Sequence, residues 1–190
     1  QDEKVGEVIE AITGLSRAVA ARPDTGDWMV LEGGGIEVDG KGRLLVTEEW
    51  LLSDVQVRNP GLSRQDYEAA FAEYLGITDT IWLGNGCAGD DTHGHIDDVA
   101  RFTPGGAVLL AYEDDASDAN HAASLDNLSR LESADFRVVK LPFPRPVIMD
   151  GQRLPASYAN LYVANGVVIV PTFNDQRDRV ALSLIADEFP

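Results

Sequence analysis

Apolar and polar positions repeat one plan along the 190 residues of the chain. Each copy begins with a short continuous apolar run and continues with a stretch whose apolar residues lie three and four apart. Such runs are typical of buried strands, and such spacing is typical of amphipathic helices. The predicted strands are 42–47, 80–83, 106–111, 137–141 and 166–171, and the predicted helices are 63–75, 119–131 and 178–188.

A further strand-like segment precedes the first strand of each copy. These segments are 28–38, 95–102 and 157–164, and glycine or asparagine residues join each one to the strand that follows. Such junctions are signals of hairpins. The repeating unit is therefore a hairpin, a helix and a closing strand, which predicts an α/β fold built as a stacked or radial array.

The repeat predicts one incomplete domain that spans residues 1–190. The proline-rich segment 142–155 is expected to be an ordered irregular connection within it. We expect a helix of a preceding unit at 1–22, units at 27–83 and 93–141, and a partial unit at 156–190.

The net charge is −17, with 32 acidic and 15 basic residues. Phosphate binding needs lysine and arginine, so this balance argues against a nucleic-acid partner. Solubility explains the charge, and attraction of a cationic substrate into an acidic cleft is the sharper alternative. The sequence lacks an apolar run of membrane-spanning length and a signal-peptide pattern, and its single cysteine fits a reducing compartment. We therefore expect a cytoplasmic protein without a membrane partner.

Segment 89–98 is the richest in chemical groups, with two of the three histidines and four aspartates. If it is extended, the two-residue side-chain period places His93, His95 and Asp97 on one face. Asp97 would then hold a guanidinium bidentately while His95 moves protons. A hydrogen-bonded polar turn is the plain alternative.

Metal ligation is the second functional interpretation of this segment. His93, His95, Asp97 and Asp98 resemble the His-x-His-x-Asp-His motif of metallo-β-lactamase-like hydrolases, with Asp98 in place of the last histidine. Dinuclear sites of that kind draw further histidines from elsewhere, and only His121 remains. A zinc-dependent hydrolase therefore stays as the alternative function.

Several ordered motifs cover essentially the whole chain. They are EGGG at 32–35, WLGNG at 82–86, DDTHGHIDDVARF at 90–102, ASYANLY at 156–162 and NGVVIVP at 165–171. Together they resemble the agmatine deiminase family, also called Porphyromonas-type peptidylarginine deiminases. The resemblance implies part of a five-bladed αβ propeller, the pentein fold of guanidino-group-modifying enzymes, with about three blades present.

The resemblance also implies a catalytic set. His95 would be the general acid/base, Asp97 would bind the substrate guanidinium, and Glu32 would orient and charge the histidine. Asp91 and Gly34 are expected to contact the substrate as well. The implied reaction is hydrolysis of agmatine to N-carbamoylputrescine and ammonia, or of a related arginine derivative such as peptidylarginine. This reaction proceeds through a covalent intermediate on a cysteine, needs no cofactor, and belongs to polyamine biosynthesis. A homodimer is a possible assembly.

The chain departs from the family pattern at several points. The family nucleophile lies in a Gly-rich segment ending in His-Cys, which is expected beyond Pro190. A Trp-x-Arg-Asp motif with a second guanidinium-binding aspartate is expected before Gln1. Cys87 stands where the family usually has another residue, and we interpret it as a loop or partly buried thiol. His93 also differs, which leaves the exact substrate open. We expect this segment alone to be inactive.

Overall fold

The computed structural model describes residues 4–190. The first repeating unit is built on a three-stranded sheet. In this sheet β1 (Glu37–Val38) pairs antiparallel with β2 (Arg43–Thr47), and β2 pairs parallel with β3 (Asp79–Leu83). Helix α3 (Arg64–Leu75) lies in the crossover between the two parallel strands. The antiparallel pair is thus followed by a helix and a parallel closing strand, as the sequence pattern predicts.

A second sheet repeats this order. Here β4 (Ala100–Phe102) pairs antiparallel with β5 (Val108–Tyr112), which pairs parallel with β6 (Val138–Pro142). Helix α4 (His121–Ser133) lies between the two parallel strands along the chain. The two units have the same topology and differ chiefly in their loops.

The third copy contains the antiparallel pair and a helix. Strand β9 (Tyr162–Ala164) pairs with β10 (Val167–Ile169), and α5 (Asp178–Glu188) follows. Within residues 4–190, β9 is the one strand that pairs with β10. The connection before this copy is less irregular than expected, because β7 (Ile148–Met149) and β8 (Gln152–Arg153) form a short hairpin in it.

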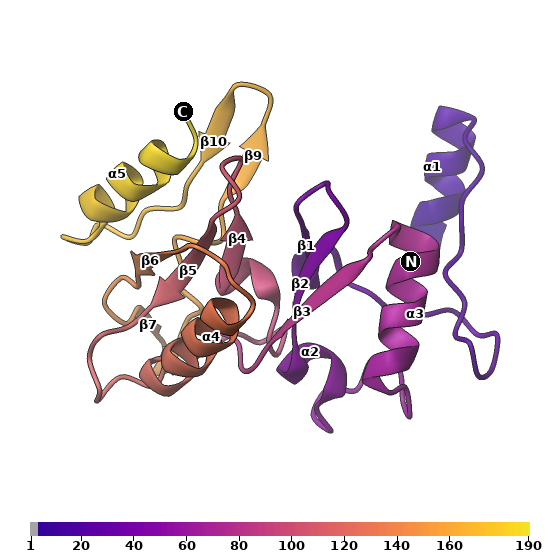
Figure 1. The fold of residues 1–190 in the computed structure, drawn as a ribbon, viewed down its shortest axis with the longest axis horizontal. Helices are drawn as coiled ribbons and strands as arrows, with labels where there is room; N and C mark the ends of the chain where they lie inside the picture. The colour runs from indigo at the N-terminus through magenta and orange to yellow at the C-terminus, as the bar shows by residue number, and fades with distance from the viewer. Residues whose placement is uncertain (1–3) are drawn as a thin grey trace.

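Alternating side chains of each sheet belong to different apolar layers. Leu44 and Val46 of β2 pack in a cluster with α3, whereas Leu45 between them packs in a cluster with the second sheet and α4. Leu109 of β5 similarly belongs to a third cluster, which includes Ile185 of α5. Because successive residues of a strand point to opposite faces, each sheet joins two layers, and the units stack along the molecule (Figure 1).

Helix α3 shows how local sequence sets these elements. Ser63 accepts a hydrogen bond from the backbone N–H of Asp66, and the Asp66 carboxylate accepts from the Ser63 backbone in return, forming a capping box. Gly76 ends the helix with a φ of 68°, a left-handed conformation that glycine adopts without a Cβ clash. The sequence prediction of this helix is confirmed to within one residue.

Several local predictions are wrong. In segment 157–164 only Tyr162–Ala164 form a strand. Helix α1 (Val5–Thr13) ends at Gly14, well before residue 22, and its apolar side chains are exposed. Segment 28–38 is not a continuous strand, because it contains the 3₁₀ turn η2 (Gly33–Gly35) before β1. The segment after β2, for which no helix was predicted, contains α2 (Glu48–Leu52), capped by Thr47, whose side chain accepts from the backbone N–H of Trp50.

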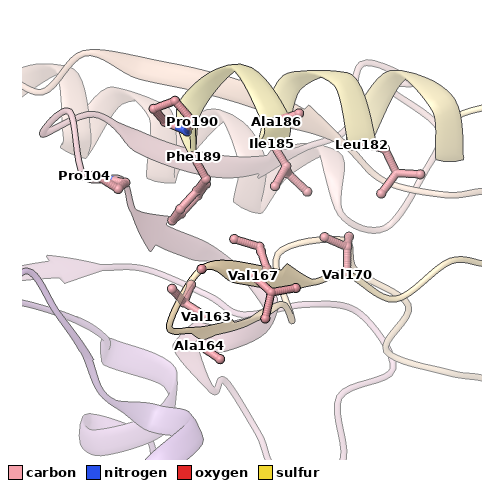
Figure 2. A pocket seen from close by; sticks show the side chains of 12 residues that line it. Pro104, Val163, Ala164, Val167, Val170, Leu182, Ile185, Ala186, Phe189 and Pro190 are labelled. Atoms are coloured by element: carbon pink, nitrogen blue, oxygen red, sulfur yellow. The ribbon is translucent and has the colours of Figure 1, made fainter.

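An apolar groove of about 450 Å³ lies between α5 and the β9–β10 hairpin. In Figure 2 the side chains of Val167, Val170, Ile185 and Phe189 lie along it. No ionisable side chain lines this groove, so it lacks groups for acid–base chemistry. In residues 4–190 we also find no helix long and apolar enough to cross a bilayer.

Candidate active site

The segment that carries the candidate histidines is folded as a turn and not as a strand. His93 has a φ of 62° and Gly94 a φ of 94°, and residues Ile96–Asp98 form the 3₁₀ turn η3. The Asp90 carboxylate causes this shape, because it accepts from the backbone N–H groups of Gly94 at 2.9 Å and His95 at 3.1 Å. The expectation of one extended face carrying both histidines is therefore wrong.

His95 and Asp97 nevertheless meet, beside the glycine triplet. A Cβ added to Gly34 would lie 2.6 Å from His95 Nδ1 and 2.7 Å from an Asp97 carboxylate oxygen. Only glycine lets the backbone approach both side chains this closely. Three residues predicted for one site, from two distant segments, are thus brought together.

The His95 ring is buried, with 9% of the residue exposed. Its Nε2 is buried and has no hydrogen-bond partner within the part of the chain that the structure describes. The ring edge packs against Trp50, with centroids 5.8 Å apart and an interplanar angle of 83°. A buried polar atom without a partner is costly, and one bound ligand atom would relieve that cost.

The two adjacent aspartates of η3 differ in environment. Burial raises the pKa of half-buried Asp97, and the charges of His95 and Arg101 oppose that rise. Burial raises the pKa of Asp98 to about 7. A 3.2 Å hydrogen bond donated by the Asn160 side chain lowers this pKa but does not offset the effect of burial. Asp98 is thus a structural carboxyl held by a neighbouring loop, whereas Asp97 faces the imidazole.

Both carboxylate oxygens of Glu32, which was predicted to orient and charge His95, accept hydrogen bonds from other residues. One carboxylate oxygen accepts from Arg58 Nε at 2.9 Å and the other from Trp50 Nε1 at 2.8 Å. Burial by itself would raise the pKa of Glu32, but these two hydrogen bonds outweigh it and lower the pKa. Glu32 therefore reaches the histidine through Trp50, the residue that also touches the ring.

Asp91 and His93 lie apart from this pair. Asp91 is exposed, and its backbone carbonyl accepts from the Gln56 side chain at 3.0 Å. His93 faces Ser53 and Glu49. Residues 4–190 hold no group of three or more histidine, cysteine, aspartate and glutamate side chains placed to bind a metal ion. The four residues of the zinc interpretation are therefore not assembled as ligands.

Cys87 belongs to the third apolar cluster and is 8% exposed. Burial raises its pKa, and the nearby charge of Asp98 raises it further. A thiolate is the nucleophilic form of cysteine, and this environment disfavours it. The prediction of a partly buried thiol holds, with deeper burial than expected.

Sequence reasoning missed two supports of the site. Trp50 links the Glu32 carboxylate to the His95 ring, and a lone tryptophan after two glutamates gives no signal of that role. Asp90 shapes the turn, and here a signal exists, because its side chain also accepts from the backbone N–H of Thr92 two residues on. Aspartate commonly makes that local bond at turns.

Comparison with known proteins gives this arrangement a context. The sequence model of the family described as Porphyromonas-type peptidyl-arginine deiminase matches residues 1–190. The agmatine deiminases of Stutzerimonas stutzeri and Medicago truncatula are 40% and 39% identical to the chain, over 85% of it and 50% of each relative. A solved structure of the agmatine deiminase of Enterococcus faecalis is 33% identical, with a TM-score of 0.83 over 100% of this chain and 56% of that one.

The chain therefore spans about half the length of the curated relatives that it matches. Its whole length is matched by the family model, and its fold is that of solved members. The chain belongs to the Porphyromonas-type peptidyl-arginine deiminase family.

Proposed function

We propose that this chain provides the acid–base histidine and one guanidinium-binding carboxylate of an agmatine deiminase. The observation that carries the proposal is the convergence of His95 and Asp97 on the backbone of Gly34. A carboxylate beside a buried imidazole with an unpartnered Nε2 suits a planar cation that must gain and lose protons. The named activity of the relatives supports agmatine as that cation.

In the proposed reaction Asp97 accepts hydrogen bonds from two guanidinium N–H groups. A cysteine thiolate attacks the guanidinium carbon, a C–S bond forms, and ammonia leaves with a proton supplied by His95. His95 then takes a proton from water, whose oxygen attacks the same carbon. The C–S bond breaks, the thiolate returns, and N-carbamoylputrescine is released. No cofactor enters these steps.

Cys87 is not the nucleophile of this proposal. It packs among core residues, and its raised pKa keeps it in the unreactive thiol form. The cysteine that attacks is instead the one that the family carries in its His-Cys segment. Peptidylarginine is the alternative substrate, and because His93 points away from Asp97 toward Ser53, it does not decide between the two.

We further propose that the repeating units are blades of a five-bladed propeller. The shared strand order of the first two sheets and the joint layers between units support this arrangement. In this proposal residues 27–83 and 93–141 form blades and 156–190 forms part of another. The described helix within 1–22, which spans Val5–Thr13, belongs to a preceding blade.

The test is ammonia release from agmatine by the longest reading frame that encodes the chain. His95→Ala and Asp97→Ala should each lower kcat/KM by about 100-fold or more, because general acid–base groups contribute on that scale. Cys87→Ala should leave turnover close to the parent value. Near-parent activity in either of the first two variants would refute the roles proposed here. The 190-residue chain by itself should release no ammonia.

A further inference from the structure

A polar pocket lies next to the segment of the candidate site, at His93. It has a volume of about 400 Å³ and is lined by Glu48, Glu49, Leu52, Ser53, Asn85 and His93. A Cβ on Gly94 would lie 2.9 Å from Glu49 Cβ and 2.9 Å from the Trp50 backbone nitrogen, so this residue packs against α2. His95 faces Trp50 and Gly34, and His93 faces this pocket.

Three side chains of this pocket form a chain of close contacts, of which the Ser53–His93 contact is within hydrogen-bond distance. Ser53 Oγ lies 3.1 Å from His93 Nε2, and His93 Nδ1 lies 3.6 Å from a Glu49 carboxylate oxygen. Ser53 Oγ already accepts from the backbone N–H of Val55 at 3.0 Å, so its own proton is free to go to the imidazole. With Nε2 as acceptor, the ring proton sits on Nδ1, facing Glu49.

Glu49 and His93 are each held by groups outside this chain of contacts. The second Glu49 oxygen accepts from the backbone N–H of Gly86 at 2.6 Å, which fixes the carboxylate. His93 keeps its left-handed φ of 62° because the Asp90 carboxylate bonds to the backbone on both sides, at Thr92 and Gly94. A non-glycine residue in that region is strained, and the surrounding structure maintains it.

We propose that Ser53, His93 and Glu49 form a nucleophilic acyl-transfer site for small uncharged carboxylic esters. Ser53 Oγ attacks the ester carbonyl, an O–C bond forms, and the serine proton passes to His93 Nε2. The ester C–O bond breaks, and the alcohol leaves with that proton. Water then attacks the acyl-serine, gives a proton to Nε2, and releases the acid as the serine is reprotonated.

The remaining lining residues fit this substrate class. Asn85 lines the pocket and is the residue there whose amide could donate to the carbonyl oxygen, and exposed Leu52 offers an apolar contact for a short acyl chain. Glu48 is paired with Arg130 at 3.1 Å and with Arg64. Its charge is thereby balanced, which favours a neutral substrate over a cation.

The test uses the intact chain with p-nitrophenyl acetate and with a fluorophosphonate probe. We expect release of p-nitrophenol and one phosphonate adduct on the peptide that contains Ser53. Ser53→Ala should abolish both signals, and His93→Asn should slow them by about 100-fold, since a general base contributes on that scale. Ser133→Ala, which removes an exposed hydroxyl of α4, is the matched control and should react like the parent.

Glu49 acts through His93 and is tested as a positioning residue. Glu49→Gln retains an oxygen for the Gly86 N–H but removes the charge beside Nδ1. It should slow labelling by about tenfold without changing the thermal midpoint, and Glu49→Asp should recover part of the rate. A parent chain that gives no Ser53 adduct, or a Ser53→Ala variant that hydrolyses the ester at the parent rate, would overturn the proposal.

Discussion

The close approach of Gly34 to His95 and Asp97 predicts that a single added methyl group, in Gly34→Ala, disturbs the candidate site. In Gly34→Ala the new Cβ would start 2.6 Å from His95 Nδ1 and 2.7 Å from the Asp97 carboxylate. Ordinary contact begins near 3.4 Å, so the two side chains together must retreat by about 0.7 to 0.8 Å or the backbone must move instead. Both routes disturb the distance between the imidazole and the carboxylate.

The size of the effect follows from the tolerance of catalytic geometry. A misplacement of about 1 Å costs on the order of 100-fold in rate when reacting groups must be aligned. We therefore expect Gly34→Ala to lower kcat/KM for agmatine by about 100-fold, in the longest reading frame that encodes the chain. The unfolding free energy should change by less than about 2 kcal/mol, because the clash involves only two side chains and Asp97 is half-buried.

Gly33→Ala is the matched control, one residue away. An added Cβ there meets nothing within 4 Å, and its φ lies outside the left-handed region. This variant should retain parent turnover and become slightly more stable, by about 0.4 to 1 kcal/mol, since alanine restricts the unfolded chain. Steady-state ammonia release and urea unfolding measure the two quantities. Equal activity of the two variants would refute the assignment of this surface.

Two further predictions concern groups around the site. Trp50→Phe keeps a ring against His95 but removes the N–H donated to Glu32, and should lower the unfolding free energy by about 1 to 2 kcal/mol in urea titrations. The folded pKa of Asp98, about 7, lies above the unfolded value of 3.8, so stability from this group is present below pH 4 and is lost as the pH rises toward 7. Between pH 4 and 7 the unfolding free energy of Asp98→Asn should therefore rise relative to that of the parent protein, by up to about 4 kcal/mol. A difference in unfolding free energy that stays constant over this pH range would contradict the raised pKa.

Periodicity alone predicted the repeating elements because each of these strands and helices places several apolar side chains in the core, which gives the sequence a regular pattern. The run at 42–47 and the stripe at 63–75 each carry many apolar positions, so a single unusual residue does not mask the pattern. Helix α2 was missed for the opposite reason. It has five residues, too few for a period, and its capping Thr47 was the only signal that could have marked its start.

The candidate pair was predicted correctly by an argument whose geometry was wrong. His95 and Asp97 were expected on one face of a strand, and they meet instead where His95, with φ −57° and ψ 138°, leads into the 3₁₀ turn that carries Asp97. A left-handed residue other than glycine, such as His93, gives no sequence signal, so its turn away from His95 was not foreseeable. The partners of Glu32 come from the loop after α2 and from α2 itself, and local pattern carries no information about them.

The topology explains why the candidate site and the polar pocket at His93 lie at the same edge of the first sheet. Strands β2 and β3 are parallel, with Thr47 opposite Leu83, so α2 and the segment after β3 leave the sheet at the same edge. Two hydrogen bonds join these segments at that edge. The Glu49 backbone N–H donates to the Gly84 carbonyl at 3.3 Å, and the Thr47 side chain donates through Oγ1 to the Gly94 carbonyl at 2.5 Å. Parallel pairing therefore brings segments far apart in sequence to one edge, a placement typical of ligand sites in α/β proteins.

The second unit places a paired carboxylate at the corresponding edge as well. Glu113 follows β5 directly, as Glu48 follows β2, and each pairs at 3.1 Å with an arginine of the following unit, Arg177 and Arg130 respectively. Glu113 is 3% exposed, whereas the Glu48 side chain is 31% exposed and lines the open pocket. The carboxylate after the middle strand therefore joins neighbouring units in both copies. The repeated topology fixes that role, and the two copies differ in how far the ion pair is open to a pocket.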